Sequence, residues 1–161
     1  MAPPLLIFAE DDHEDWRLIR DTLQDCTEDV QFERVEDGVD LISRLRNETL
    51  PLPNLILLDL QMPKMGGAET LRMIRADILL RHIPVVIMTT SKLEADVFKA
   101  YSDGANSYLI KPVTFEAMGS ALTRLHDYWL NVVELPTPPA GNTPPEGTQV
   151  PAAFLKRAEE G

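Results

Sequence analysis

Apolar residues gather in five short runs along the first two thirds of the chain. The runs are Leu5–Ala9, Gln31–Val35, Leu55–Leu58, Val85–Met88 and Ser107–Ile110. Four of them are nearly continuous, which is typical of strands that are buried on both faces of a parallel sheet. Gln31–Val35 instead alternates polar and apolar residues, which indicates an edge strand.

Apolar residues at helical spacing lie between these runs and predict helices. The marking residues are Trp16, Ile19, Leu23 and Cys26 for the first helix, Val39, Ile42 and Leu45 for the second, Leu71, Ile74 and Ile78 for the third, and Leu93, Val97 and Tyr101 for the fourth. Ser91 and Glu94 form a capping box before the fourth helix, and a fifth begins near Thr114. The alternation predicts an α/β fold with a doubly wound parallel sheet and helices on both faces.

The composition changes near Pro136. Residues 136–151 carry six prolines together with Gly, Thr and Asn. Such a segment does not bury enough apolar surface to form a core, which predicts an extended tail. We therefore divide the chain into a domain over residues 1–135 and a Pro-rich C-terminal extension over residues 136–161.

Charge and cysteine content narrow the function classes. The 161 residues carry a formal net charge of −11. This acidity argues against a nucleic-acid surface or attraction to anionic lipid, since both need clustered Lys and Arg. Cys26 is the only cysteine, so no intrachain disulfide forms, and a reducing compartment such as the cytoplasm is expected. No signal peptide and no apolar run of the ~20 residues that span a bilayer are recognisable.

Carboxylates follow two of the predicted strands. Glu10, Asp11 and Asp12 follow the first strand, and Asp59 follows the third. Ligands of open parallel sheets bind at the carboxyl ends of the strands, so neighbouring strands would bring these acids together. Their mutual repulsion favours a hard cation such as Mg²⁺ or Mn²⁺. The alternative is helix capping, the role we expect for Asp12.

Complementary groups follow the last two strands. Thr89 and Thr90 end the fourth strand, and Lys111 ends the fifth. A hydroxyl and an ammonium group beside a carboxylate and a divalent cation are what a bound phosphoryl group needs. Taken singly, each residue is better explained as a cap or a solvated side chain. Their combination at four strand ends indicates a phosphoryl site.

Four segments of the chain resemble the receiver domains of two-component response regulators. They are Glu10-Asp11, Asp59–Gly67, Ile83–Thr89 and Ala105–Pro112, within a likeness that runs from about Leu5 to Trp129. The resemblance implies a flavodoxin-like sheet with strand order 2-1-3-4-5. It also implies transfer of a phosphoryl group from a sensor histidine kinase to an aspartate, with Mg²⁺ as cofactor.

The resemblance also implies a role for each site residue. Asp59 is the phosphoacceptor, and the metal is held by Glu10, Asp11, Asp59 and the backbone carbonyl of Gln61. The phosphoryl group is bound by Thr89, Thr90 and Lys111, the switch residues are Thr89 and Tyr108, and the Lys111–Pro112 bond is cis. The chain departs from the common pattern in having Glu10 in place of Asp and Thr90 in place of a smaller residue. Gln61 and Ser91 stand at variable positions.

Apolar residues in the last helix follow a heptad spacing. They are Phe115, Met118, Leu122, Leu125 and Trp129, and more apolar residues follow as far as Leu135. This face either packs on the chain's own sheet or supports a homodimer, and we favour a dimer interface of Leu122, Leu125, Trp129, Leu130 and Val133 together with the extension. The Tyr128-Trp129 ending resembles small regulators that partner bacterial phytochromes, which implies a phytochrome-type kinase.

Three functions remain in competition. The first is a stand-alone response regulator, which is phosphorylated, removes its own phosphoryl group, and acts on no outside substrate. The second is a phosphorylation-independent binding or dimerisation module, against which the full set of site residues argues. The third is a hydrolase with an aspartyl-phosphate intermediate, which needs a second acid where this chain has Gln61.

Overall fold

A parallel five-stranded sheet forms the centre of the computed structural model, which describes residues 2–26, 28–137 and 147. Its strands are β1 (Leu5–Ala9), β2 (Gln31–Val35), β3 (Leu55–Leu58), β4 (Val85–Thr89) and β5 (Ser107–Ile110). They are arranged in the order β2-β1-β3-β4-β5, which confirms the predicted topology. The predicted edge position of β2 is also confirmed, and β5 forms the other edge.

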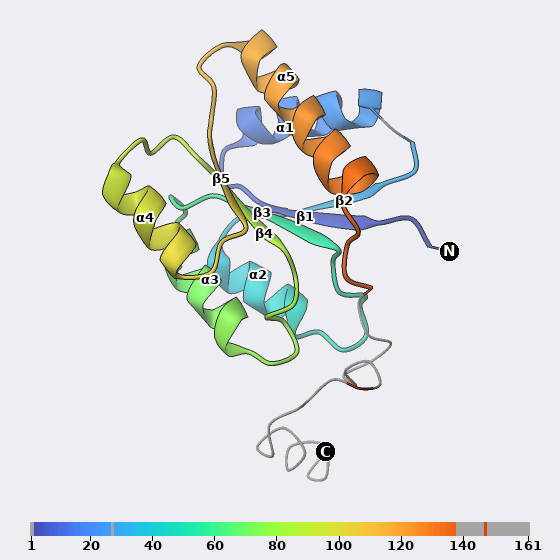
Figure 1. The fold of residues 1–161 in the computed structure, drawn as a ribbon, viewed down its shortest axis with the longest axis vertical. Coiled ribbons are helices and arrows are strands. Elements are labelled where there is room, and N and C mark those ends of the chain that lie inside the picture. The colour runs from blue at the N-terminus through green and yellow to red at the C-terminus, as the bar shows by residue number, and fades with distance from the viewer. Residues whose placement is uncertain (1, 27, 138–146, 148–161) are drawn as a thin grey trace.

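Helices cover both faces of the sheet (Figure 1). They are α1 (His13–Cys26), α2 (Gly38–Leu45), α3 (Gly67–Ala76), α4 (Glu94–Ser102) and α5 (Phe115–His126). In Figure 1, α1 and α5 lie on one side of the sheet, and α2, α3 and α4 lie on the other. No helix among the described residues is long and apolar enough to cross a membrane.

The sheet separates two hydrophobic cores, because successive side chains of a strand point to opposite faces. In β1, Ile7 faces the core with α2 and α3, whereas Phe8 faces the core with α1 and α5. β1, β3 and β4 are buried along their whole length, as their continuous apolar runs predicted. The predicted burial of β5 on both faces is wrong, because an edge strand has a neighbour on one side only and its side chains stay partly exposed.

Two helices differ from the sequence pattern. α3 ends at Ala76, where Asp77 adopts an extended conformation, so Ile78 lies in the following turn and not on the helix. In α4, Ala100 is buried whereas the predicted inward residues Leu93 and Tyr101 are exposed. The predicted capping box is also wrong, because Leu93 stands at the cap position of α4 without a side-chain cap hydrogen bond, and the hydroxyl of Ser91 donates to Asp96.

The last helix extends beyond α5 as a π-helical segment, Asp127–Val132. The start of α5 directly after Thr114 is as predicted, and Thr114 caps the helix by accepting a hydrogen bond from the amide of Ala117. Val133 then adopts an extended conformation. Most of the predicted Pro-rich extension lies outside the described residues.

Candidate functional site

The sheet brings the predicted strand-end residues to one edge. Ala9 of β1 pairs with Leu58 of β3, so the residues directly after them, Glu10 and Asp59, lie side by side. The amide of Asp59 donates to the carbonyl of Ala9, at 3.1 Å. On the other side of β3, the amide of Lys111 donates to the carbonyl of Thr89, at 2.8 Å. The predicted convergence is therefore present.

Three carboxylates from this edge form a cluster that suits a cation. Glu10, Asp11 and Asp59 each offer an oxygen within 4.8 Å of the others. Glu10 and Asp59 are buried, whereas Asp11 is exposed. The oxygen-only ligand set and the open side at Asp11 fit Mg²⁺ or Mn²⁺, since such ions prefer carboxylates and retain several waters.

The ammonium group of Lys111 is bound by three carboxylates. Its Nζ atom lies 2.6 Å from Oε2 of Glu10, 2.8 Å from Oδ2 of Asp15 and 2.8 Å from Oδ2 of Asp59. Burial alone would lower the pKa of Lys111, but hydrogen bonds to Asp15, Asp59 and Glu10 raise it above the ordinary lysine value. Burial raises the pKa of Glu10 to about 7, against the opposing effect of Lys111.

Asp15 is a site residue that sequence reasoning missed. It lies in the first turn of α1, and its carboxylate is about one third exposed. Asp12 directly precedes this turn and caps it, accepting hydrogen bonds from the amides of Glu14 and Asp15, both at 2.9 Å. The one signal in the sequence is that Asp15 lies in the first turn of the helix that directly follows Glu10 and Asp11.

The hydroxyl of Thr89 is buried and has no hydrogen-bond partner among the described residues. The side chain is fully enclosed at the end of β4. A buried hydroxyl with no partner is costly, so its presence at this site indicates a partner that arrives from outside. An oxygen of a phosphoryl group on Asp59 fits this requirement.

Two further predicted residues lie at the rim of the site. Gln61 donates its backbone amide to Oδ1 of Asp59, at 3.0 Å, which fixes the carboxylate from the side opposite Lys111. Thr90 is exposed, and its hydroxyl lies 3.4 Å from the side-chain oxygen of Gln61. Gln61 thus contacts Asp59 through its backbone and Thr90 through its side chain.

Two glycines, Gly67 and Gly38, allow the loop after β3 to pack closely against the site. A Cβ atom on Gly67 would stand 2.2 Å from the carbonyl oxygen of Asp59, so no larger residue fits there. On the outer side of the loop, Gly38 donates its amide to the carbonyl of Met65, at 3.1 Å. The start of α2 thereby supports the loop that carries Gln61.

The loop after β1 is held by Arg34, which projects from β2. The guanidinium group donates to the backbone carbonyls of Glu10 and Asp11, at 2.8 and 3.0 Å. It also contacts Nδ1 of His13, at 3.0 Å. The backbone of two cluster residues is therefore fixed by a side chain from a neighbouring strand.

Tyr108 lies on β5, with its ring against the core beneath α4. Its hydroxyl donates to the backbone carbonyl of Ser91, at 3.0 Å. The predicted cis bond between Lys111 and Pro112 is wrong, because no peptide bond between described residues is cis. The two isomers of an X–Pro bond differ by only about 0.5–1 kcal/mol, so the sequence alone does not determine which one the fold selects.

The residues assigned to a dimer interface divide into two groups. Leu122 and Leu125 are buried in the chain's own core between α1 and the sheet, so their assignment to the interface is corrected. Trp129 and Leu130 are only partly buried at the edge of that core. Val133 is half-buried after the π-helical segment.

Comparison with known proteins agrees with this geometry. The family model of the response regulator receiver domain matches residues 6–123. Response regulator Rcp1 of Synechocystis sp. is 36% identical over 138 residues, which cover 83% of this chain and 94% of Rcp1. The probable methanogenesis regulatory protein FilR2 of Methanothrix harundinacea is 35% identical over 139 residues, covering 84% of this chain and 90% of FilR2.

Solved structures show the same likeness. The Mn²⁺-bound form of Rcp1 superposes with a TM-score of 0.81 at 35% identity, covering 84% of this chain and all of Rcp1 (100%). The phosphorylated cyanobacterial phytochrome response regulator RcpA gives a TM-score of 0.81 at 34% identity, with coverage of 84% and 100%. The chain therefore belongs to the response regulator receiver domain family.

Proposed function

We propose that this response regulator accepts a phosphoryl group on Asp59 from a sensor histidine kinase. The observation that carries the proposal is the set of groups around one carboxylate. Lys111 lies 2.8 Å from Asp59, the acidic cluster adjoins it, and the unpaired hydroxyl of Thr89 ends the neighbouring strand.

These positions allow direct transfer of the phosphoryl group from the kinase to Asp59. An oxygen of Asp59 attacks phosphorus as the bond from phosphorus to the donor's imidazole nitrogen breaks. The electron pair of that bond stays on the nitrogen, which takes up a proton. Lys111 then pairs with the new phosphoryl oxygens, and Thr89 donates its hydroxyl hydrogen to one of them. A Mg²⁺ ion held by Glu10, Asp11, Asp59 and the carbonyl of Gln61 would neutralise charge on the same oxygens.

The output is a changed protein surface near α4. A hydroxyl of Thr89 drawn towards the phosphoryl group changes the space beside β5, where Tyr108 already packs against the core. The hydrogen bond from Tyr108 to the carbonyl of Ser91 links this change to the segment that enters α4. Phosphorylation thus changes the charge at Asp59, and this local change shifts the segment before α4 between two conformations.

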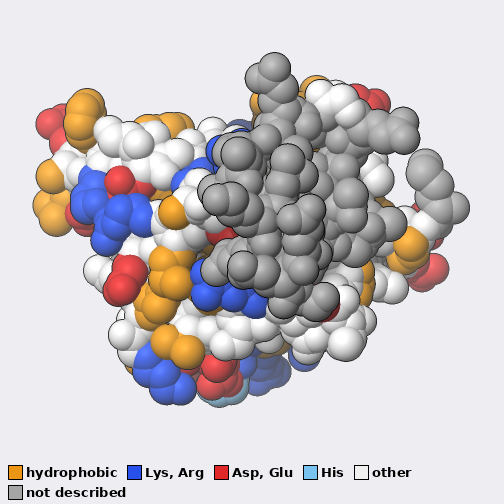
Figure 2. Space-filling model, turned by 90° about the horizontal axis from the view of Figure 1, so that it is seen from below, with side chains coloured by type: hydrophobic (Ala, Val, Ile, Leu, Met, Phe, Trp, Pro, Cys, Tyr) orange, Lys and Arg blue, Asp and Glu red, His pale blue; other side chains and the backbone are white. Residues whose placement is uncertain are grey.

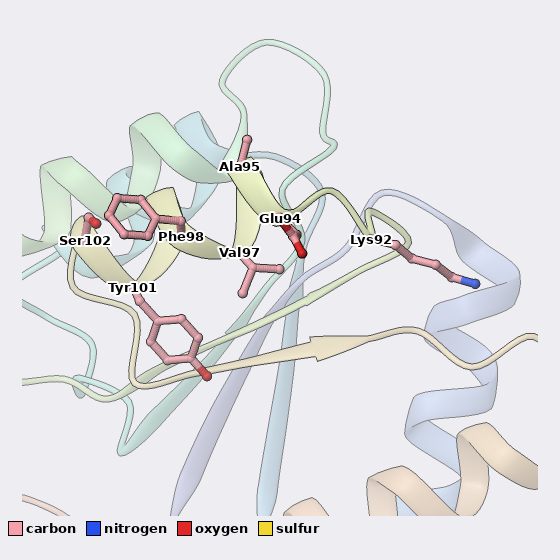
Figure 3. A pocket seen from close by; sticks show the side chains of 7 residues that line it. All are labelled: Lys92, Glu94, Ala95, Val97, Phe98, Tyr101 and Ser102. Carbon is pink, nitrogen blue, oxygen red and sulfur yellow. The ribbon is translucent and has the colours of Figure 1, made fainter.

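The surface around α4 has the character of a contact site. A cavity of about 680 Å³ is lined by Val97, Phe98 and Tyr101, with Lys92 and Glu94 at one end (Figure 3). Phe98 is 77% exposed, unusual for so large an apolar side chain. Figure 2 shows hydrophobic side chains among charged ones at the left end of the molecule, where Figure 1 places α4. We assign this surface to a protein partner that distinguishes the two states.

We further propose that the chain forms a homodimer through the end of its last helix. Trp129, Leu130 and Val133 keep exposed apolar surface, and Val132 is 71% exposed. The test is sedimentation of the full chain and of a chain truncated near Asp127. Loss of dimer on truncation supports the proposal, and equal monomers contradict it. We also propose a phytochrome-type kinase partner, on the likeness to the phytochrome response regulator RcpA. A cytoplasmic location, expected from the single cysteine, completes the proposal.

Phosphorylation is tested with Mg²⁺ and a small phosphodonor such as acetyl phosphate. Intact mass measurement should show one added phosphoryl group in the wild type and none in Asp59→Asn. Asp103→Asn is the matched control, because Asp103 lies on α4's C-terminal side and pairs with Lys99 and Arg72. Absence of labelling with this donor and with cognate kinases would favour the phosphorylation-independent binding module.

A further inference from the structure

We propose that Asp15 is a positioning residue that holds Lys111 in the pocket while a divalent cation occupies the carboxylate cluster. The inference deepens the proposed function, since it concerns the same site. It starts from the three acceptors of Lys111. Two of them, Glu10 and Asp59, belong to the cluster that suits a cation, whereas Asp15 does not.

The three acceptors therefore differ once a cation binds. Carboxylate oxygens that coordinate a divalent ion give up part of their negative charge, so they attract the ammonium of Lys111 less. The cation and the ammonium also repel each other at this range. Asp15 reaches Lys111 from α1, at 2.8 Å, and keeps its full charge for that contact.

The contact between Asp15 and Lys111 is important because Lys111 is buried. The side chain of Lys111 is 5% exposed, so an ammonium released by Glu10 and Asp59 finds little water inside the pocket. The carboxylate of Asp15 is 34% exposed and extends the pocket towards solvent. A Lys111 retained there stays within reach of the phosphoryl group that Asp59 receives.

Metal affinity should change in a defined direction when Asp15 loses its charge. Without that charge, Lys111 depends on Glu10 and Asp59 alone and competes more strongly with the cation for their oxygens. We expect Asp15→Asn to weaken Mg²⁺ binding about five-fold to ten-fold. Glu14→Gln is the matched control, because Glu14 loses the same charge in the same turn, is exposed, and does not contact Lys111. It should change the affinity by less than two-fold.

A double-mutant cycle separates action through Lys111 from a general charge effect. Mg²⁺ affinity is measured by titration calorimetry in the wild type, Asp15→Asn, Lys111→Met and the double variant. If Asp15 acts through Lys111, Asp15→Asn changes the affinity by less than two-fold in the Lys111→Met background. An equal loss in both backgrounds, or no loss in the wild-type background, overturns the proposal.

A second measurement does not depend on the folding of Lys111→Met. In the Mg²⁺-saturated protein, the ammonium protons of Lys111 should exchange slowly by nuclear magnetic resonance, and Asp15→Asn should accelerate the exchange at least ten-fold. Glu14→Gln should leave it unchanged, and equal exchange in all three proteins contradicts the proposal. Neither experiment uses a phosphodonor, so a failure here is distinct from a failure of Asp59 as acceptor.

Discussion

The hydroxyl of Tyr108 donates a hydrogen bond of 3.0 Å to the backbone carbonyl of Ser91, which ties β5 to the segment that enters α4. Tyr108→Phe removes this bond and leaves the ring in place. We expect the free energy of unfolding in urea to fall by about 0.5–1.5 kcal/mol. Tyr128→Phe, at an exposed position in the last helical segment, should change it by less than about 0.5 kcal/mol. Equal effects of both changes would mean that the Ser91 bond does not stabilise the resting state.

Thr89→Val should affect stability and function in opposite directions. Valine keeps the branched shape that suits β4 and removes the unpartnered hydroxyl. Relief of that buried polar group should stabilise the unphosphorylated protein by about 1–3 kcal/mol in urea unfolding. Phosphorylation of Asp59 by acetyl phosphate should slow at least ten-fold, as measured by intact mass. A destabilised variant would indicate that the hydroxyl has a partner in the resting protein.

The free energy of unfolding should depend on pH through the titration of Glu10. Its pKa is raised to about 7 in the folded protein, above the ordinary value of 4.5, mainly by burial. The folded state therefore binds the proton more tightly, and the stability of the metal-free protein relative to Glu10→Gln should fall as the pH rises from about 4.5 to about 7. The limit is about 1.4 kcal/mol per pH unit. A constant difference across this range would show that Lys111 keeps Glu10 ionised.

Arg34→Ala should loosen the loop between β1 and α1. Arg34 donates to the carbonyls of Glu10 and Asp11, so its loss leaves both without this partner. The backbone amides of residues 11–15 should exchange with deuterium about ten-fold faster. Arg44→Ala is the control, because Arg44 binds Glu33 of the same strand at a site remote from this loop. Comparable acceleration in both variants would attribute the effect to general destabilisation.

Replacement of a glycine by alanine should destabilise the protein at the site and stabilise it in α5. Gly67→Ala places a methyl group against the backbone of Asp59 and should cost about 1–3 kcal/mol or more in thermal unfolding. At Gly119, in α5, the added methyl group would have no neighbour within 4 Å among the residues that the structure describes. It should raise stability by about 0.5–1 kcal/mol, since alanine favours a helix. A tolerated Gly67→Ala would mean that the loop moves freely away from Asp59.

The sheet and most of the site were predictable because they depend on local patterns. Continuous apolar runs mark buried strands, and a parallel sheet brings the residues after each strand to one edge, so Asp59 and Lys111 were expected to meet. Asp15 was missed because its role depends on how α1 lies over the sheet, and an acidic residue in a first helical turn has an ordinary explanation in the helix dipole.

Other differences arise from tertiary packing. The spacing of Leu93 and Tyr101 is that of an inward face, yet α4 packs through the small residue Ala100. The spacing of Leu125 fits both a dimer interface and the core of the domain. Its burial against α1 shows that it belongs to the core. Periodicity identifies a helical face, but it does not identify the surface that the face covers.

The three-carboxylate contact of Lys111 has a consequence for how the segments around the site are joined. The ammonium group lies against Glu10, Asp15 and Asp59 at once, so it offsets part of the repulsion among these carboxylates. The same contact joins the end of β5 to the ends of β1 and β3 and to the first turn of α1.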